Sequence, residues 1–303
     1  MKKIRKITRY RSIVGENDEL LHEYKSSFQE FDINNNRIKD VDYTSSGEIE
    51  TASRFTYDEK DRLIEEIHYF DEEEVGEIVR YKFNEEGKTK EIETTYADGS
   101  VSLKKISRLE NMLSVKAYDE DGEQDGEDLI KYNEDGKVVE EINFDEDHAV
   151  AQRAVYAYND KQQIESRIDY VAKDEFLQKL VFEYDNNGNA VRETQLNRKD
   201  KPVRQVAYNY NKENKLVGWE NSQHLHRSKY DEEGRLVYEE TINNINKMVE
   251  SFTEYKFDED GLLTESRSFE MGEQYQMEPG VMARTKLNFV VIRYEYEFFD
   301  KVD

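Results

Sequence analysis

The fold is decided by the stretch Tyr230-Asp231-Glu232-Glu233-Gly234-Arg235-Leu236, in which an aromatic residue is followed by Asp and, four positions after the aromatic, by Gly. An Asp at this place can accept hydrogen bonds from backbone amides in a tight turn, and glycine accepts the positive φ that such a turn requires. Apolar residues on either side alternate with polar ones, which is the period of a β-strand. The stretch therefore predicts a strand, a tight turn with a bulge, and a second strand.

The pattern recurs every 26 residues, which is typical of a repeat protein whose units stack on their neighbours. A second turn in the middle of most units, for example at Phe144-Asp145, makes each unit a β-hairpin. We therefore expect an all-β fold, a repetitive antiparallel meander of about twenty strands that forms a long curved or superhelical sheet or an open cylinder. The repeated aromatic followed by Asp or Asn stands at Phe31, Tyr57, Phe83, Tyr132, Tyr158, Tyr184 and Tyr210.

Three segments are expected along the chain: a basic N-terminal cap segment at 1–30, a β-repeat domain at 31–270, and a loop with a capping strand at 271–303. The repeat slips between Leu109 and Tyr132, where we expect extra turns at 118–122 and at Asp125-Gly126. It slips again between Tyr210 and Tyr230. Such slips either correct the register or project from one face to carry recognition.

The two ends differ from the repeats in composition. The basic segment, with Lys2 to Arg11 at its start, is either a first strand that pairs with an acidic neighbour or an arm that docks on a partner or an anionic surface. Residues 272–284 contain Pro279-Gly280 and predict a turn or loop. The apolar strand expected at 287–299 is interpreted as a cap, with part of a contact surface as the alternative.

The chain is strongly acidic, with 44 Lys and Arg against 69 Asp and Glu and a formal charge of −25. Such a charge repels phosphates, so nucleic-acid binding is not expected. The acidic groups either keep a long sheet soluble and protect its edges or attract a basic protein partner. Absence of Cys excludes disulfides and thiolate chemistry, and no run has transmembrane length, so we expect no membrane insertion and a cytoplasmic location.

Candidate chemistry is sparse, and we expect no catalytic residues, no cofactor and no metal site. The acidic cluster Asp119, Asp121, Asp125 and Asp128 lacks the spacing of a calcium loop and is better explained by turns. His224 and His226 lie on one face of a strand but lack a third ligand nearby. The fold explains six residues least well, and these are the candidates for partner binding: Trp219, His224, His226, Phe289, Val290 and Tyr294.

The turn motifs at 132–138, 184–188, 230–236 and 257–263 resemble the YD repeats of rearrangement-hot-spot proteins and teneurins, and the related short repeats of bacterial antitoxin-type proteins. The resemblance covers about Phe31 to Phe269. It implies a β-shell that encloses a toxin and is closed by a self-cleaving Asp-Pro segment. Neither Pro202 nor Pro279 follows an Asp here, and the chain is short for a closed shell, so it resembles an isolated repeat module.

Three classes of function follow. The first is a non-enzymatic protein-binding scaffold, such as an immunity protein or a chaperone for a basic toxin or secretion effector. The second is a structural subunit that self-associates or joins a larger assembly through exposed sheet edges. The third and least favoured is an enzyme, a hydrolase for example, with its pocket near Trp219 to His226.

Overall fold

The structure is a computed structural model and describes residues 3–14, 20–71, 73–278 and 281–300. It is an antiparallel meander of 22 strands, which confirms the predicted all-β hairpin meander. The one helical element in these ranges is a single 3-10 turn at Ala172–Asp174. No helix in the described part of the chain is long and apolar enough to cross a membrane.

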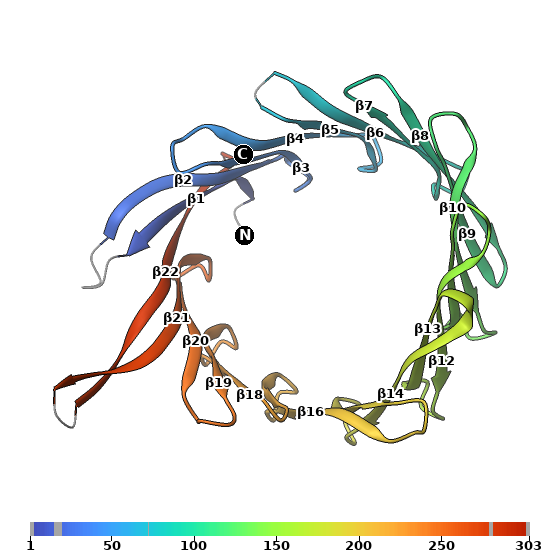
Figure 1. Cartoon of the computed structure of the whole chain (residues 1–303). Helices are drawn as coiled ribbons and strands as arrows, with labels where there is room; N and C mark the ends of the chain where they lie inside the picture. Colours follow the sequence, from blue (N-terminus) through green and yellow to red (C-terminus); the bar gives the residue numbers. More distant parts are fainter. Residues whose placement is uncertain (1–2, 15–19, 72, 279–280, 301–303) are drawn as a thin grey trace. The chain divides into compact units, whose positions relative to one another are not determined.

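The chain divides into two compact units, and successive strands within each lie side by side (Figure 1). Unit 1 comprises Met1–Phe55, Tyr69–Glu74 and Asn209–Asp303, and unit 2 comprises Thr56–His68 and Val75–Tyr208. The strands mainly in unit 1 are β1 (Ile4–Val14), β2 (Leu20–Phe31), β3 (Arg37–Tyr43), β4 (Ile49–Tyr57), β17 (Leu216–Glu220), β18 (His224–Tyr230), β19 (Leu236–Asn243), β20 (Val249–Phe257), β21 (Leu263–Glu278) and β22 (Val281–Phe298). Those mainly in unit 2 are β5 (Leu63–Tyr69), β6 (Val75–Phe83), β7 (Thr89–Tyr96), β8 (Val101–Leu109), β9 (Met112–Tyr118), β10 (Gln124–Tyr132), β11 (Val138–Phe144), β12 (Val150–Tyr158), β13 (Ile164–Val171), β14 (Glu175–Tyr184), β15 (Ala190–Leu196) and β16 (Pro202–Tyr210).

The repeated turn has the predicted chemistry. After Tyr184, the Asp185 carboxylate accepts hydrogen bonds from the backbone amides of Asn187 and Asn189, both at 2.9 Å. Gly188 then takes the positive φ of 90°. The register between β14 and β15 shifts at Glu183/Tyr184, as the expected bulge requires. Where glycine is absent, the residue at the same position also has positive φ: Asn35, Asp61, His148, Gln162 and Asn214.

One predicted turn is wrong, and one predicted loop is largely strand. Asp125 and Gly126 lie within strand β10, where a register shift and a φ of 157° at Gly126 mark a bulge. A strand Cβ at Gly126 would lie 3.1 Å from the Phe144 carbonyl oxygen, so the glycine allows close approach of β11. The loop predicted at 272–284 is instead the end of β21 and the start of β22; Pro279 and Gly280 lie outside the described residues.

The first and last strands of the meander pair with each other. In unit 1, β22 is hydrogen-bonded to both β21 and β1, and β1 is hydrogen-bonded to both β22 and β2. The basic N-terminal segment is therefore a strand, and Lys6 forms an ion pair of 3.2 Å with Glu297 of β22. This is the pairing with an acidic neighbour that the sequence favoured, and β22 fills a place between two strands instead of capping an edge.

Aromatic stacking holds the C-terminal hairpin to the rest of unit 1. Phe269 of β21 stacks on Phe252 at a centroid distance of 4.3 Å and on Phe289 at 3.7 Å. Val14 of β1 and Val291 of β22 complete this buried cluster. Aromatic pairs of this kind add about 0.5–1.5 kcal/mol each beyond the area they bury, so the cluster stabilises the junction of the two chain ends.

Candidate functional site

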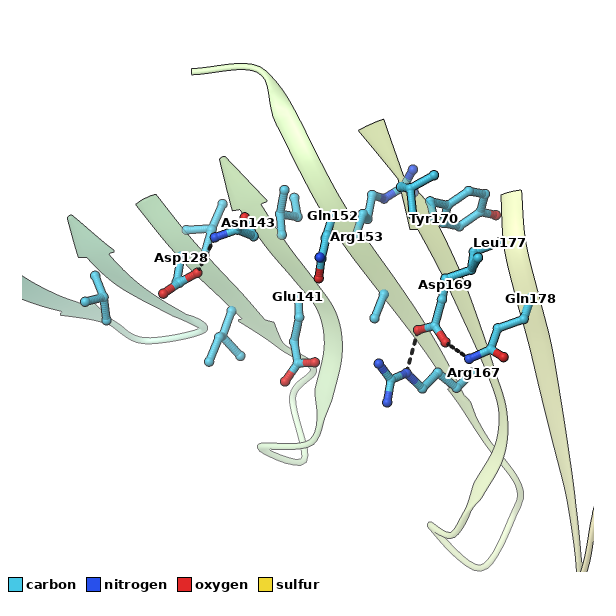
Figure 2. Close-up of a pocket in the computed structure, with 16 residues that line it drawn as sticks. Asp128, Glu141, Asn143, Gln152, Arg153, Arg167, Asp169, Tyr170, Leu177 and Gln178 are labelled. Atoms are coloured by element: carbon cyan, nitrogen blue, oxygen red, sulfur yellow. Dashed lines mark hydrogen bonds and ion pairs between the residues drawn. The ribbon is translucent and has the colours of Figure 1, made fainter. Parts of the chain in front are cut away.

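A groove lies on one face of the sheet in unit 2, where β9 to β14 run side by side (Figure 2). It has a volume of about 550 Å³. The register places Ala154 of β12 directly between Glu141 of β11 and Asp169 of β13, on the same face. Ala154 has only a methyl group, so the sheet is hollowed where its two neighbours carry long polar side chains. We call this region the β12 groove.

Most polar side chains of the β12 groove bond to one another. Arg167 Nε donates to Asp169 Oδ1 at 2.6 Å, and Gln178 Nε2 donates to Asp169 Oδ2 at 2.7 Å. Asn143 Nδ2 donates to Asp128 Oδ1 at 2.8 Å. Figure 2 shows Arg167 and Gln178 on either side of the Asp169 carboxylate. Asp169, although buried, is therefore satisfied at both oxygens.

Two carboxylates of the groove are bonded only to neutral donors. The Asn143 amide donates a hydrogen bond to Asp128, and the Tyr156 hydroxyl donates one of 2.6 Å to Glu141 Oε2. Burial, together with this bond to Glu141, raises the pKa of Tyr156 to about 12, so Tyr156 stays a neutral donor at ordinary pH. Within the described residues, neither Asp128 nor Glu141 makes an ion pair, so both leave a carboxylate oxygen open to a cation.

The two arginines of the groove already have acidic neighbours. Against the effect of burial, the hydrogen bond to Asp169 and then nearby charges that include Glu141 raise the pKa of Arg167. Arg167 is bonded to Asp169, and its guanidinium lies 5.6 Å from the ring centroid of Tyr156. Arg153 forms ion pairs with Glu140 at 2.7 Å and with Asp174 at 2.9 Å.

The carboxylates of Asp128 and Glu141 lie near each other. Asp128 is opposite Asn143 in the register, and Glu141 is two residues before Asn143 on the same face of β11. Asp128 and Glu141 are therefore diagonal neighbours, which lie roughly 7–8 Å apart. One long cationic side chain, or two adjacent ones, can reach both.

The predicted residues Trp219 and His226 are brought together in unit 1. They are cross-strand partners in the short β17–β18 hairpin, and their rings stack at 5.6 Å with an angle of 8°. Gly218 makes this hairpin possible, because a Cβ there would lie 2.6 Å from the carbonyl oxygen of His226. The nitrogens of His226 lie 3.2 Å from Ser228 Oγ and 3.4 Å from Thr241 Oγ1, so its ring is held by neighbouring hydroxyls.

His224 faces a different partner. Its Nε2 lies 3.4 Å from Glu250 Oε2. Across the described part of the chain, no group of three or more His, Cys, Asp or Glu side chains could hold a metal ion.

The three predicted residues of β22 are separated from Trp219 and the histidines in sequence and differ in burial. Phe289 is 7% exposed and belongs to the aromatic cluster, so its side chain is not available to a partner as the strand stands. Val290 and Tyr294 are half-buried on the other face of β22, where the Arg9 guanidinium lies 6.0 Å from the Tyr294 ring. Their role in binding stays a prediction.

Sequence reasoning missed the β12 groove. From the sequence, both Asp119 and Asp128 are explained by turns. This explanation is right for Asp119, whose carboxylate accepts hydrogen bonds from the backbone amides of Asp121 and Glu123. It is wrong for Asp128. Asp128 lies inside β10 and faces the groove. The available signal was Ala154, a small residue at a position where three other repeats carry a larger apolar side chain, Val79, Leu180 or Val206.

The chain is similar to two kinds of solved structure. One is a crystal structure of TcdB2-TccC3-TEV, with 11% identity and a TM-score of 0.35 over 89% of this chain and 21% of that chain. Another is a porin-like protein from Bacteroides uniformis ATCC 8492, with 10% identity and a TM-score of 0.33 over 97% of this chain and 98% of that chain. The chain spans about a fifth of the TcdB2-TccC3 chain.

With TM-scores below 0.5, these likenesses support no conclusion about activity, partner or cellular location. No protein-family model matches the chain, and no curated protein matches it.

Proposed function

We propose that this chain is a non-enzymatic β-repeat scaffold that binds a basic protein through its acidic sheet surface, with the β12 groove as a principal contact. The observation that carries the proposal is that Asp128 and Glu141 line one groove and have only neutral hydrogen-bond donors. A Lys or Arg side chain of the partner adds a positive charge at hydrogen-bond distance and can form charge-assisted hydrogen bonds to both carboxylates. The net charge of −25 attracts the same kind of partner over a longer range.

An immunity protein or chaperone for a basic toxin or secretion effector is the specific role that we propose for such a scaffold. The YD-like turn motifs support this assignment at the level of the repeat. A cytoplasmic location, which the sequence favours, stays a prediction. The enzyme alternative is less favoured because the ring of His226, the best candidate for a base, is stacked on Trp219 instead of lining a pocket of the described residues.

The structural-subunit alternative depended on exposed sheet edges. The terminal strands β1 and β22 offer no such edge along their paired residues, because each is hydrogen-bonded on both sides. A scaffold that binds through a face of its sheet agrees better with this pairing than one that binds through the edges of its terminal strands.

The experiment is affinity capture from the native lysate at low and at moderate salt, with mass spectrometry of the retained proteins. The proposal expects a stoichiometric basic partner that is released as salt is raised, because screening weakens contacts between exposed charges. Recovery of the chain alone, or with further copies of itself, at both salt concentrations would contradict it.

A further inference from the structure

A group of basic side chains surrounds one aromatic ring on β1 to β3 of unit 1. The ammonium nitrogens of Lys25, Lys6 and Lys39 lie 4.1, 5.2 and 5.2 Å from the centroid of the Phe28 ring. Arg54 of β4 is directly opposite Lys39 in the register. We call these four cations and Phe28 the Phe28 cluster.

The cations of the Phe28 cluster have few acidic partners, although the chain has 69 acidic residues. Lys6 is paired with Glu297, but Lys25, Lys39 and Arg54 form no ion pair with any described residue. Glu30 is opposite both Lys6 and Lys39 in register, and it is the one carboxylate that the register places among them. The cluster therefore holds an excess of positive charge.

This arrangement is unfavourable for the fold alone. Like charges directly opposite on neighbouring strands, as at Lys39 and Arg54, destabilise a sheet. Burial and then the nearby Lys6 ammonium lower the pKa of Lys25, so its charged form is disfavoured where it stands. A bound anion would relieve both effects.

A hollow of about 280 Å³ lies over Phe28, Lys39 and Arg54 of the cluster. Lys39 and Arg54 line it, together with the apolar side chains of Val41 and Ala52 and the rings of Tyr43 and Tyr69. The Arg54 guanidinium lies 5.5 Å from the Tyr69 ring, so the ring limits where this cation can lie. The volume suits a small ligand, and the rings offer an apolar wall beside the cations.

We propose that this hollow binds a dianionic phosphate group, with Lys39 and Arg54 as its direct ligands and Lys25 adding charge beside Phe28. The planar fork of Arg54 matches two phosphate oxygens, and Lys39 acts as a point charge. A dianion suits several neighbouring cations better than a single carboxylate does. Because the chain as a whole is acidic, only such a local excess of cations can hold an anion.

Calorimetric titration of the full chain at low salt tests this proposal with three probes: phenyl phosphate, inorganic phosphate and benzoate. One phosphate site per chain is expected, with benzoate at least tenfold weaker. Tighter binding of phenyl phosphate than of inorganic phosphate supports a phosphate ester that uses the Tyr43 and Tyr69 wall. Equal binding of the two supports free phosphate as the ligand.

Matched variants locate the site. Lys39→Gln and Arg54→Gln should each weaken phosphate binding roughly tenfold, since a hydrogen bond to a charged group is lost. Lys199→Gln and Arg198→Gln remove the same charges from an exposed turn of unit 2 and should change binding less than twofold. At one phosphate concentration, phosphate should also raise the melting temperature of the wild type and both control variants more than that of the two cluster variants.

Absence of heat at millimolar phenyl phosphate would overturn the proposal. So would benzoate binding as tight as phosphate binding, or equal losses in the cluster and control variants.

Discussion

Gln163 Nε2 donates a hydrogen bond of 3.1 Å to the carbonyl oxygen of Gly188, which is 25 residues further along the chain. Gln163 is the fifth residue after its turn aromatic, Tyr158, and Gly188 is the positive-φ residue of the next repeat turn. Lys215, the fifth residue after Tyr210, makes the equivalent contact: its Nζ donates a hydrogen bond of 2.7 Å to the carbonyl oxygen of Gly234. Successive hairpins are thus joined turn to turn as well as strand to strand.

The glycine of a repeat turn can have two roles: it takes a positive φ, and it leaves room for the side chain that arrives from the preceding turn. Substitution at two different glycines separates these roles. At Gly188 an added Cβ would lie 3.2 Å from Gln163 Nε2, whereas at Gly136 it would meet nothing within 4 Å. Both glycines have positive φ, so Gly→Ala costs about 1–2 kcal/mol of unfolding free energy at each. We expect Gly188→Ala to cost more than Gly136→Ala in urea unfolding. Equal losses would mean that the Gln163 side chain moves aside from the added methyl group at no cost.

The acidic turns predict how stability depends on pH. Hydrogen bonds from the side chain and then the backbone of Arg62 lower the pKa of Asp58 from 3.8 to about 2. Because the folded pKa is depressed, the stabilisation is present above the unfolded pKa and is lost as pH falls through about 2.

Asp58→Asn keeps an acceptor for the turn amides but removes this titration. The unfolding free energy of the variant, measured by denaturant between pH 5 and pH 2, should therefore fall less than that of the wild type. Asp135→Asn is the control and should have the pH profile of the wild type, because the Asp135 carboxylate makes no hydrogen bond with any described residue. The explanation fails if the wild type and Asp58→Asn have parallel pH profiles.

Much of the fold could be predicted because each turn is local. An aromatic, an Asx residue and a residue tolerant of positive φ lie within five positions, and Asn35, Asp61 and Asn214 take the positive φ where glycine is absent. Gly126 misled the prediction because an acidic Asp-Gly pair in a strand bulge has the composition of a turn. The long β21–β22 hairpin was missed because its strands lack the 26-residue period, although their pairing continues.

The candidate site depends on contacts that no local pattern contains. Ala154, Glu141 and Asp169 belong to three strands, and only the register of the sheet places them side by side. Each looks in the sequence like an ordinary residue of an alternating strand. By contrast, Trp219 and His226 were both candidates because they lie in the register slip between Tyr210 and Tyr230, a stretch of sequence that a single short hairpin largely fills.

Phe289 should behave as a core residue. Its ring is 7% exposed and stacks on Phe269 at 3.7 Å. Phe289→Ala should lower the unfolding free energy by about 3–5 kcal/mol, the usual cost of removing a buried aromatic ring. Val290→Ala, at the half-buried neighbouring position, should cost clearly less. If Phe289→Ala left stability unchanged, the ring would instead be free to bind a partner.

The Trp219–His226 stack should also contribute to stability. His226→Ala removes an aromatic pair and should cost about 0.5–1.5 kcal/mol in urea unfolding followed by the fluorescence of Trp219. His224→Ala, on the same strand but without the stack, is the control and should cost less. A larger loss at His224 than at His226 would show that the stack is not the stabilising contact.

The most direct measurement for the central claim compares three forms of the chain in quantitative affinity capture from the native lysate at low salt. These are the wild type, the groove variant Asp128→Asn/Glu141→Gln, and the control Glu134→Gln/Asp135→Asn, which removes the same charge from an exposed turn. The account predicts a stoichiometric basic protein retained by the wild type and the control and reduced at least tenfold with the groove variant. Equal retention by all three forms would contradict a role for the β12 groove, and absence of any basic partner would contradict the scaffold itself.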